Sequence, residues 1–158
     1  MPNHFYIRYT LALNLRKISS KMKKNRVLLI LFLISQGALA DKIMPFKSDG
    51  CSAFPDGTID QNDLWFKCCY QHDIAYWKGG TYQQRMDADK ELKQCVANVG
   101  EPIIAQLMLA GVRVGGSPFF PTNFRWGYGW PYMRGYQPLS DEETIEINIL
   151  LKTIESKN

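Results

Sequence analysis

Four cysteines constrain this chain more than any other feature. They are Cys51, Cys68, Cys69 and Cys95, and the middle two are neighbours in the sequence. An even number of cysteines in an exported chain indicates disulfides. Adjacent side chains on a helix diverge by about 100°, so a bond between Cys68 and Cys69 is disfavoured. Each of them is therefore expected to pair with Cys51 or Cys95, and two arrangements remain open.

The first 40 residues have the composition of an export leader. Basic residues at 21–26 precede an apolar run at 27–35, and the small residues Ala38 and Ala40 follow. This order is typical of a secretory signal peptide, and the run is shorter than the roughly 20 residues that span a bilayer. We expect an N-terminal extension and signal peptide at 1–40, cut near Ala40, a single domain at 41–158, and a secreted or periplasmic location.

The positive charge of the chain belongs to this leader. All 15 acidic residues lie in 41–158, whereas 7 of the 19 Lys and Arg residues lie in 1–40. The remaining chain has 12 basic and 15 acidic residues, a net charge of −3. It therefore gives no reason to expect a nucleic-acid partner. The sequence does not indicate an oligomeric state.

The pattern of the mature chain predicts a mainly α fold that begins with an antiparallel helix pair. Asp60 is a candidate cap for a helix that runs to about Trp77. The break at 78–81 ends it, and Thr81 is a candidate cap for a second helix that runs to about Val99. A break this short predicts that the two helices are antiparallel.

Two further helices are expected in the second half of the chain. One covers 101–116, with Pro102 in its first turn, and the other follows a capping box at 140–143. Between them, residues 117–138 have no clear period and carry eight aromatics from Phe119 to Tyr136. This aromatic-rich segment has two interpretations. It packs as an irregular lid over the core, or it meets a lipid headgroup region, for which Trp, Tyr and Arg are well suited.

The stretch "CCYQHDIAY" at 68–76 is the candidate for chemistry. Structural zinc is disfavoured, because His72 is the only histidine in 41–158 and zinc needs four ligands. A cysteine nucleophile needs a free thiol, whereas every cysteine here has a partner available. An ordinary histidine on a disulfide-linked helix remains the alternative to a catalytic one.

The neighbours of His72 favour the catalytic interpretation. Asp73 lies on an adjacent strip of the same helix, and Tyr76 lies one turn further along the strip of His72. If Cys68 is bonded to Cys95, Asp89 on the second helix comes to a similar height as His72, whereas Asp87 faces more nearly the right way. The spacing alone does not choose between these two aspartates.

These residues resemble the secreted phospholipase A2 superfamily over about residues 49–96. "CCYQHDIAY" is similar to its active-site helix, CCxxHDxxY, and "DKELKQC" to its second helix, in which a catalytic aspartate lies six residues before a cysteine. The resemblance therefore selects Asp89 over Asp87. It also implies the disulfides Cys51–Cys69 and Cys68–Cys95, in a phospholipase A2-like fold with a calcium-binding loop.

The resemblance implies roles for the site residues. His72 would be the base that activates a water, Asp89 would fix its tautomer, and Tyr76 would hold Asp89. A Ca²⁺ cofactor would be bound by the Asp73 carboxylate together with backbone carbonyls of the loop. The loop ligands expected from their positions are Gly50, Ser52, and Phe54 or Gly57.

The same loop departs from the animal enzymes, whose C-G-x-G sequence is replaced here by "GCSAFPDG". The chain looks more like a bacterial-type branch of the superfamily. The implied function is a secreted calcium-dependent phospholipase A2 that hydrolyses the sn-2 ester of glycerophospholipids at a phospholipid membrane surface. The alternative is a catalytically silent relative that acts as a secreted binding protein or toxin subunit.

Overall fold

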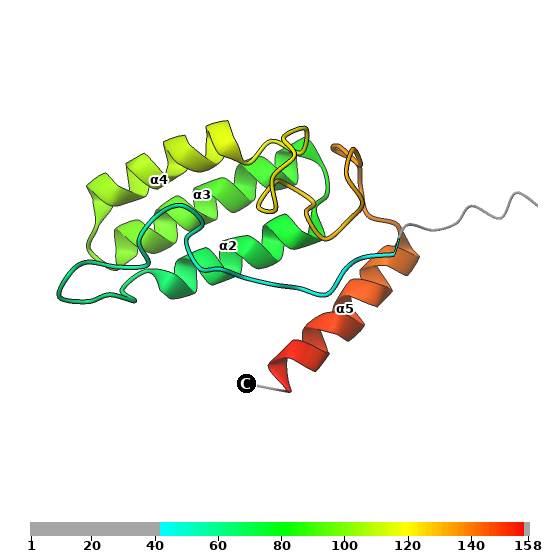
Figure 1. Ribbon diagram of the computed structural model, residues 1–158, viewed down its shortest axis with the longest axis horizontal. Coiled ribbons are helices and arrows are strands. Elements are labelled where there is room, and N and C mark those ends of the chain that lie inside the picture. Colours follow the sequence, from blue (N-terminus) through cyan, green and yellow to red (C-terminus); the bar gives the residue numbers. More distant parts are fainter. Residues whose placement is uncertain (1–41, 157–158) are drawn as a thin grey trace, which may run out of the picture. The chain divides into compact units, whose positions relative to one another are not determined.

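The computed structural model describes residues 42–156, and the signal peptide expected at 1–40 lies outside them. The described part is mainly α, as predicted, with four helices and no strand. Figure 1 shows their arrangement. The helices are α2 (Phe66–Lys78), α3 (Tyr82–Asn98), α4 (Pro102–Gly115) and α5 (Asp141–Glu155). None of the described helices combines the length and the apolar character of a membrane span.

Two disulfides hold the first helix in place. Cys68, near the start of α2, is bonded to Cys95, near the end of α3, so the two helices run antiparallel. Cys69 is bonded to Cys51, which ties the loop before α2 to that helix. This is the pairing that the resemblance implies. α3 also packs against α4, and Figure 1 shows α3 drawn between α2 and α4.

The caps expected for α3 and α5 are present. The Thr81 hydroxyl accepts from the backbone N–H of Gln84, and the Gln84 side chain accepts from the N–H of Thr81. Ser140 and Glu143 make the same reciprocal pair at the start of α5. Both helices therefore begin where the sequence predicts, because each cap satisfies backbone donors that have no partner within the helix.

The expected cap at Asp60 is wrong, since α2 begins only at Phe66. Residues 58–65 form turns, and Asp60 is exposed. Trp65 sets the start instead: it is 3% exposed, its backbone N–H donates to the Asp56 carbonyl, and its indole N–H donates to the Pro55 carbonyl. Burial of this large side chain against the loop outweighs a local cap signal that is worth about 1 kcal/mol.

The aromatic-rich segment packs over the end of α2 with its tryptophans. Trp126 and Trp130 are buried, and their indole N–H groups donate to the carbonyls of Gly80 and Lys78. The backbones also approach closely here, because a Cβ on Gly79, whose φ is 68°, would lie 2.9 Å from the Cα of Gly127. The part of the segment around Trp126 and Trp130 therefore packs on the core, as the first interpretation predicts. Other aromatics of the segment remain exposed, among them Phe119, Phe120, Phe124 and Tyr132.

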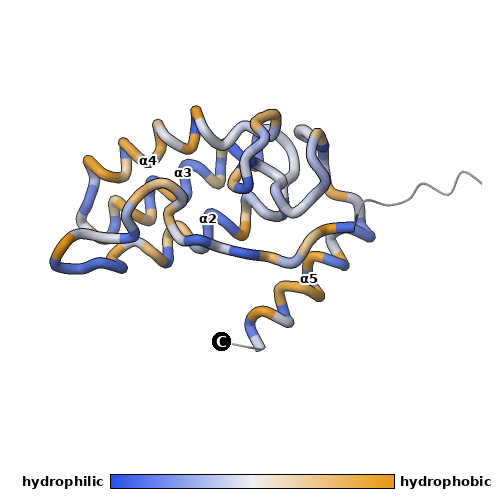
Figure 2. Tube along the Cα trace, in the orientation of Figure 1, coloured by the Kyte–Doolittle hydropathy of each residue, from blue (hydrophilic) through white to orange (hydrophobic). Residues whose placement is uncertain are grey.

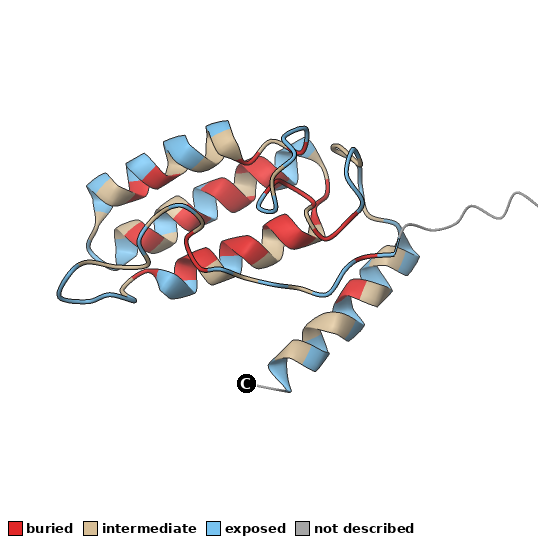
Figure 3. Ribbon diagram, viewed as in Figure 1, coloured by how far each residue is buried: buried red, intermediate tan, exposed pale blue. Residues whose placement is uncertain are grey.

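The last helix, α5, packs against Trp130 of the aromatic-rich segment and Trp77 of α2. Ile147 of α5 is buried in contact with the cluster that contains Trp77 and Trp130. Arg134 lies over the Trp130 ring and forms an ion pair with Glu143 at 2.7 Å, which joins the aromatic-rich segment to the first turn of α5. In Figure 3 the buried residues gather on α2 and α3, where the candidate chemistry also lies.

Candidate active site

His72 and Asp89 form a buried pair across the α2–α3 interface. The Nε2 atom of His72 lies 3.1 Å from Oδ1 of Asp89, and the two residues are 8% and 0% exposed. Asp87, the other candidate, is half-exposed on α3 and accepts from Gln83 and Lys90 instead. Of the two aspartates, the structure therefore brings Asp89 to the histidine.

Tyr76 holds the same carboxylate oxygen. Its hydroxyl donates to Oδ1 of Asp89 at 2.7 Å. Burial, with the neighbouring negative charge of Asp89 as the second cause, raises the pKa of Tyr76 well above its usual range. The phenol therefore stays protonated and remains a donor to the carboxylate at all ordinary pH values.

These contacts fix the tautomer of His72. An ionised carboxylate can only accept, so the proton of neutral His72 lies on Nε2 when it contacts Asp89. The lone pair then lies on Nδ1, which has no hydrogen-bond partner within residues 42–156. A histidine held in this way presents a free proton acceptor, which is the requirement for a general base.

Two arginines complete the surroundings of Asp89, and the sequence analysis missed both. Nε of Arg113 on α4 lies 2.8 Å from Oδ2 of Asp89, although its N–H is not aligned for a hydrogen bond, so the contact is ionic. Arg85 is buried, and its Nε donates to the hydroxyl of Tyr76. Arg85 also donates to the carbonyls of Val112 and Arg113, which joins α3 to α4.

A weak signal for Arg85 does exist in the sequence. It lies four residues before Asp89, so the two belong to one face of α3. This spacing places Arg85 near Asp89, although in the structure Arg85 reaches that carboxylate only through the Tyr76 hydroxyl. No comparable signal exists for Arg113, because its contact with Asp89 depends on how α4 packs against α3.

Asp73 faces the loop rather than α3. Its carboxylate accepts from the Ser48 hydroxyl at 2.6 Å and is 9% exposed. Burial raises the pKa of Asp73 to about 7, the Ser48 hydrogen bond opposes the shift, and the charges of Asp49 and Asp56 add to it. No nearby positive charge therefore balances the negative charge of Asp73 among the described groups that shift its pKa.

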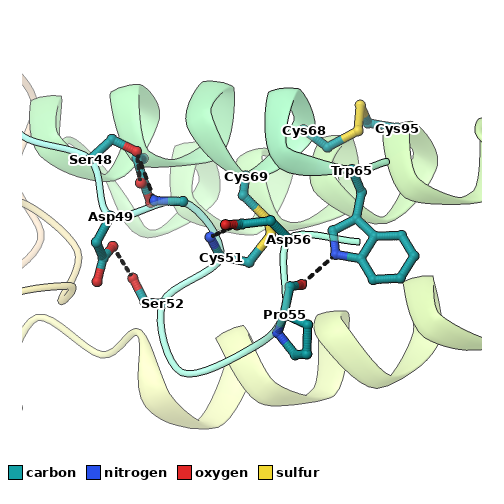
Figure 4. The surroundings of a disulfide bond; sticks show 12 residues. Ser48, Asp49, Cys51, Ser52, Pro55, Asp56, Trp65, Cys68, Cys69 and Cys95 are labelled. Atoms are coloured by element: carbon teal, nitrogen blue, oxygen red, sulfur yellow. Dashed lines mark hydrogen bonds between the residues drawn. A yellow bond between two sulfur atoms is a disulfide. The ribbon is translucent and has the colours of Figure 1, made fainter. Parts of the chain in front are cut away.

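The loop residues predicted as ligands fall into two groups. Gly50, Ser52 and Phe54 line the same cavity as Asp73, whereas Gly57 does not and lies against the backbone of residues 61–63. The Gly50 carbonyl accepts from the N–H of Ser52 at 3.1 Å. This region is drawn in Figure 4.

Asp56 shapes this loop from inside. Its carboxylate accepts from the N–H of Cys51 at 2.7 Å (Figure 4). Gly50 has a φ of 76°, and a Cβ there would lie 2.3 Å from Oδ1 of Asp56. The positive φ therefore favours glycine at position 50, and the Asp56 carboxylate holds the loop by accepting from the backbone N–H of Cys51.

The donor set around Asp73 fits a hard cation. Residues 42–156 contain no cluster of three or more His, Cys, Asp or Glu side chains suited to a metal. A cation at this place would therefore depend on the Asp73 carboxylate, loop carbonyls and water, which are all oxygen donors of the kind that Ca²⁺ prefers. The undercompensated carboxylate of Asp73 is the observation that supports this fit.

A largely apolar cavity opens beside His72 and Asp73. Its volume is about 350 Å³. Apart from His72, Asp73, Tyr76 and the loop, the side chains that line it are those of Cys69, Leu92, Leu107, Met108, Val112 and Phe124. A ligand in this cavity would meet a mostly apolar wall and would lie beside His72.

Comparisons with known proteins leave the family open. No protein-family model, curated protein or solved structure matches this chain.

Proposed function

We propose that this protein is a secreted calcium-dependent phospholipase A2 that hydrolyses the sn-2 ester of glycerophospholipids. The observation that carries the proposal is the buried His72–Asp89–Tyr76 arrangement at the wall of an apolar cavity. An apolar cavity of this size suits an acyl chain, and the histidine beside it suits the activation of a water molecule.

The residues of the chain have distinct parts in this reaction. Nδ1 of His72 takes a proton from water as the water oxygen attacks the ester carbonyl carbon. Asp89 stabilises the resulting imidazolium, while Tyr76 and Arg113 hold the carboxylate in place. The imidazolium then returns the proton to the departing glycerol oxygen, which leaves a fatty acid and a lysophospholipid.

Asp73 would hold Ca²⁺ together with oxygens of the loop around Gly50, Ser52 and Phe54. When bound, the cation would supply positive charge for the negative oxygen that develops on the ester carbonyl. Asp73 is adjacent to His72 in the sequence and lines the same cavity, so that charge would lie beside the base.

The surface around the cavity suits a phospholipid membrane. Ile103, Leu107 and Val114 recur at helical spacing on α4 and are more than half exposed. Leu107 and the exposed Phe124 also line the cavity, so this apolar surface reaches its rim. Figure 2 shows the apolar residues along α4. An exposed apolar surface next to a cavity is typical of a site that draws lipid from an aggregate.

Fatty-acid release from mixed phospholipid vesicles tests the proposal. The lipid carries different labelled chains at sn-1 and sn-2, and the assay is run with calcium and with EDTA. We expect release of the sn-2 chain alone, and only with calcium. Binding to the vesicles without release of either chain would instead support the catalytically silent alternative.

A matched pair of variants ties the activity to this site. Asp89→Asn replaces the carboxylate behind His72, whereas Asp87→Asn makes the same change at a half-exposed position two residues away that does not contact His72. We expect fatty-acid release to fall by a factor of about 10² or more in Asp89→Asn, because a positioned general base contributes about that much to the rate. Asp87→Asn should keep the rate of the parent. Equal rates in both would refute the assignment of Asp89.

A further inference from the structure

A second, more polar cavity lies next to the first. Its volume is about 650 Å³, and it lies between residues 44–52 and 123–129. Ser52, Asp73 and Phe124 line both cavities, so the two meet at the proposed calcium site. The proposed function uses the first cavity for the acyl chain and leaves the second without a role.

Arg125 is the unusual side chain in the second cavity. It is 9% exposed, and its two protein acceptors are the carbonyls of Thr122 and Trp130, at 3.1 and 2.7 Å. Its guanidinium forms no ion pair with a carboxylate within residues 42–156. Burial lowers the pKa of Arg125, although a guanidinium stays charged at any ordinary pH. A buried cation without an anion is costly, which points to a ligand that supplies the anion.

Other side chains of the cavity support an anionic ligand. Lys47 is exposed at the wall of the cavity and, within the described chain, has no carboxylate partner. Asn123 adds an amide from the segment that carries Arg125. Tyr128 donates to the Lys47 carbonyl at 2.7 Å, which links the two walls of the cavity. The cations therefore come from both walls.

Two carboxylates also line this cavity, and their position matters. Asp73 is shared with the first cavity, and Asp49 accepts from Ser52, which is shared as well. Both carboxylates therefore belong to the border between the cavities, where the proposed Ca²⁺ would neutralise them. Arg125 and Asn123 belong to the opposite wall, which carries no carboxylate among the residues that line the cavity.

We propose that the second cavity binds the headgroup phosphodiester of the phospholipid through Arg125 and Lys47, and that it favours anionic headgroups over those with a quaternary ammonium group. This inference rests on the proposed function, since one lipid would place its ester at the border, its acyl chain in the first cavity and its headgroup in the second. A guanidinium binds two phosphate oxygens at once, and a second cation nearby repels a choline group.

A competition experiment measures this preference directly. Phosphatidylglycerol and phosphatidylcholine with different sn-2 chains are placed in the same vesicles, in a matrix of non-hydrolysable ether lipid. Because both substrates share one surface, the ratio of the two released fatty acids is independent of how well the protein binds the vesicle. We expect the parent to favour phosphatidylglycerol. Both lipids carry the phosphodiester, so a lost hydrogen bond to it cancels in the ratio. Arg125→Gln should still lower the ratio several-fold, because it removes a positive charge that repels the choline group.

Additional variants keep the test decisive if Arg125→Gln does not fold. Lys47→Gln changes an exposed side chain and should lower the ratio several-fold. Arg125→Lys keeps the positive charge and should keep the ratio close to that of the parent. Lys152→Gln, an exposed lysine on α5 that lines neither cavity, is the control and should leave the ratio unchanged. An unchanged ratio in the folded Lys47→Gln protein, or a ratio that falls as far in Arg125→Lys as the loss of a charge would make it fall, would overturn the inference.

A binding arm separates this inference from the proposed function. The parent is titrated with glycerophosphoglycerol, glycerophosphocholine and inorganic phosphate by calorimetry, which requires no hydrolysis. We expect glycerophosphoglycerol to bind most tightly and Lys47→Gln to weaken it. If the protein binds in this way but releases no fatty acid, the proposed hydrolysis is refuted and the headgroup site is supported. Tightest binding of inorganic phosphate, or no binding that depends on Lys47, would overturn the headgroup site.

Discussion

Replacing Asp73 by Asn should stabilise the metal-free protein at neutral pH. Burial raises the pKa of this carboxyl from 3.8 to about 7, so the folded state holds a proton that the unfolded state has released over that range. The contribution of Asp73 to the free energy of unfolding is therefore complete below about pH 4, declines as the pH rises, and is fully lost above about pH 7. Asn is uncharged at every pH and avoids this loss.

The size of the effect follows from the shift. A difference of about three pKa units corresponds to about 4 kcal/mol, and we take about 2 kcal/mol because water still reaches part of the carboxyl. For a domain of this size, 2 kcal/mol raises the melting temperature by about 8 °C. In EDTA, the Asp73→Asn protein should match the parent at pH 4 and exceed it by this amount at pH 8.

The assay is urea unfolding followed by circular dichroism at both pH values, with Asp87→Asn as the control. The side chain of Asp87 is half-exposed, and its hydrogen bond from Gln83 lowers its pKa, so its replacement should give no gain at pH 8. Calcium should stabilise the parent at pH 8 and not the Asp73→Asn protein. A parent and variant that change in parallel between pH 4 and 8 would refute the account of Asp73.

Two further predictions concern the framework of the site. Arg113→Gln leaves the fully buried Asp89 without its cation, so it should destabilise the protein by about 2 kcal/mol and lower fatty-acid release. Arg113→Lys should retain part of the stability and part of the release. An unchanged urea midpoint and an unchanged release rate in Arg113→Gln would contradict the ion pair. Replacing Cys68 and Cys95 by Ser opens a bridge between residues 27 apart in the sequence, which should cost about 3–4 kcal/mol of unfolding free energy, measured by urea unfolding against the Cys51–Cys69 double variant.

The sequence predicts those helix boundaries that are set by local chemistry. Thr81 and Ser140 each cap a helix through a residue three positions later, so a window of four residues contains all the information. The start of α2 is different. It depends on Trp65 and its bonds to Pro55 and Asp56, which lie in a loop up to ten residues away, and no local pattern reveals such burial.

The site divides in the same way. Helical spacing places Tyr76 and His72 on one strip of α2, and the structure retains that relation. Helical spacing alone left Asp87 and Asp89 open, because the choice depends on how α3 is rotated against α2. The contact of Arg113 with Asp89 depends on the packing of a third helix, and the cavity of Arg125 depends on an aperiodic segment. Neither has a signature in the spacing of residues.

The central claim is that His72 is the base of an ester hydrolysis, and its replacement by Gln tests this most directly. Gln preserves a donor for Asp89 and removes the proton acceptor at Nδ1. In calcium-containing buffer, the parent should release the sn-2 fatty acid, and folded His72→Gln should be slower by roughly 10²–10⁴. Release by the folded variant at the rate of the parent would contradict the account.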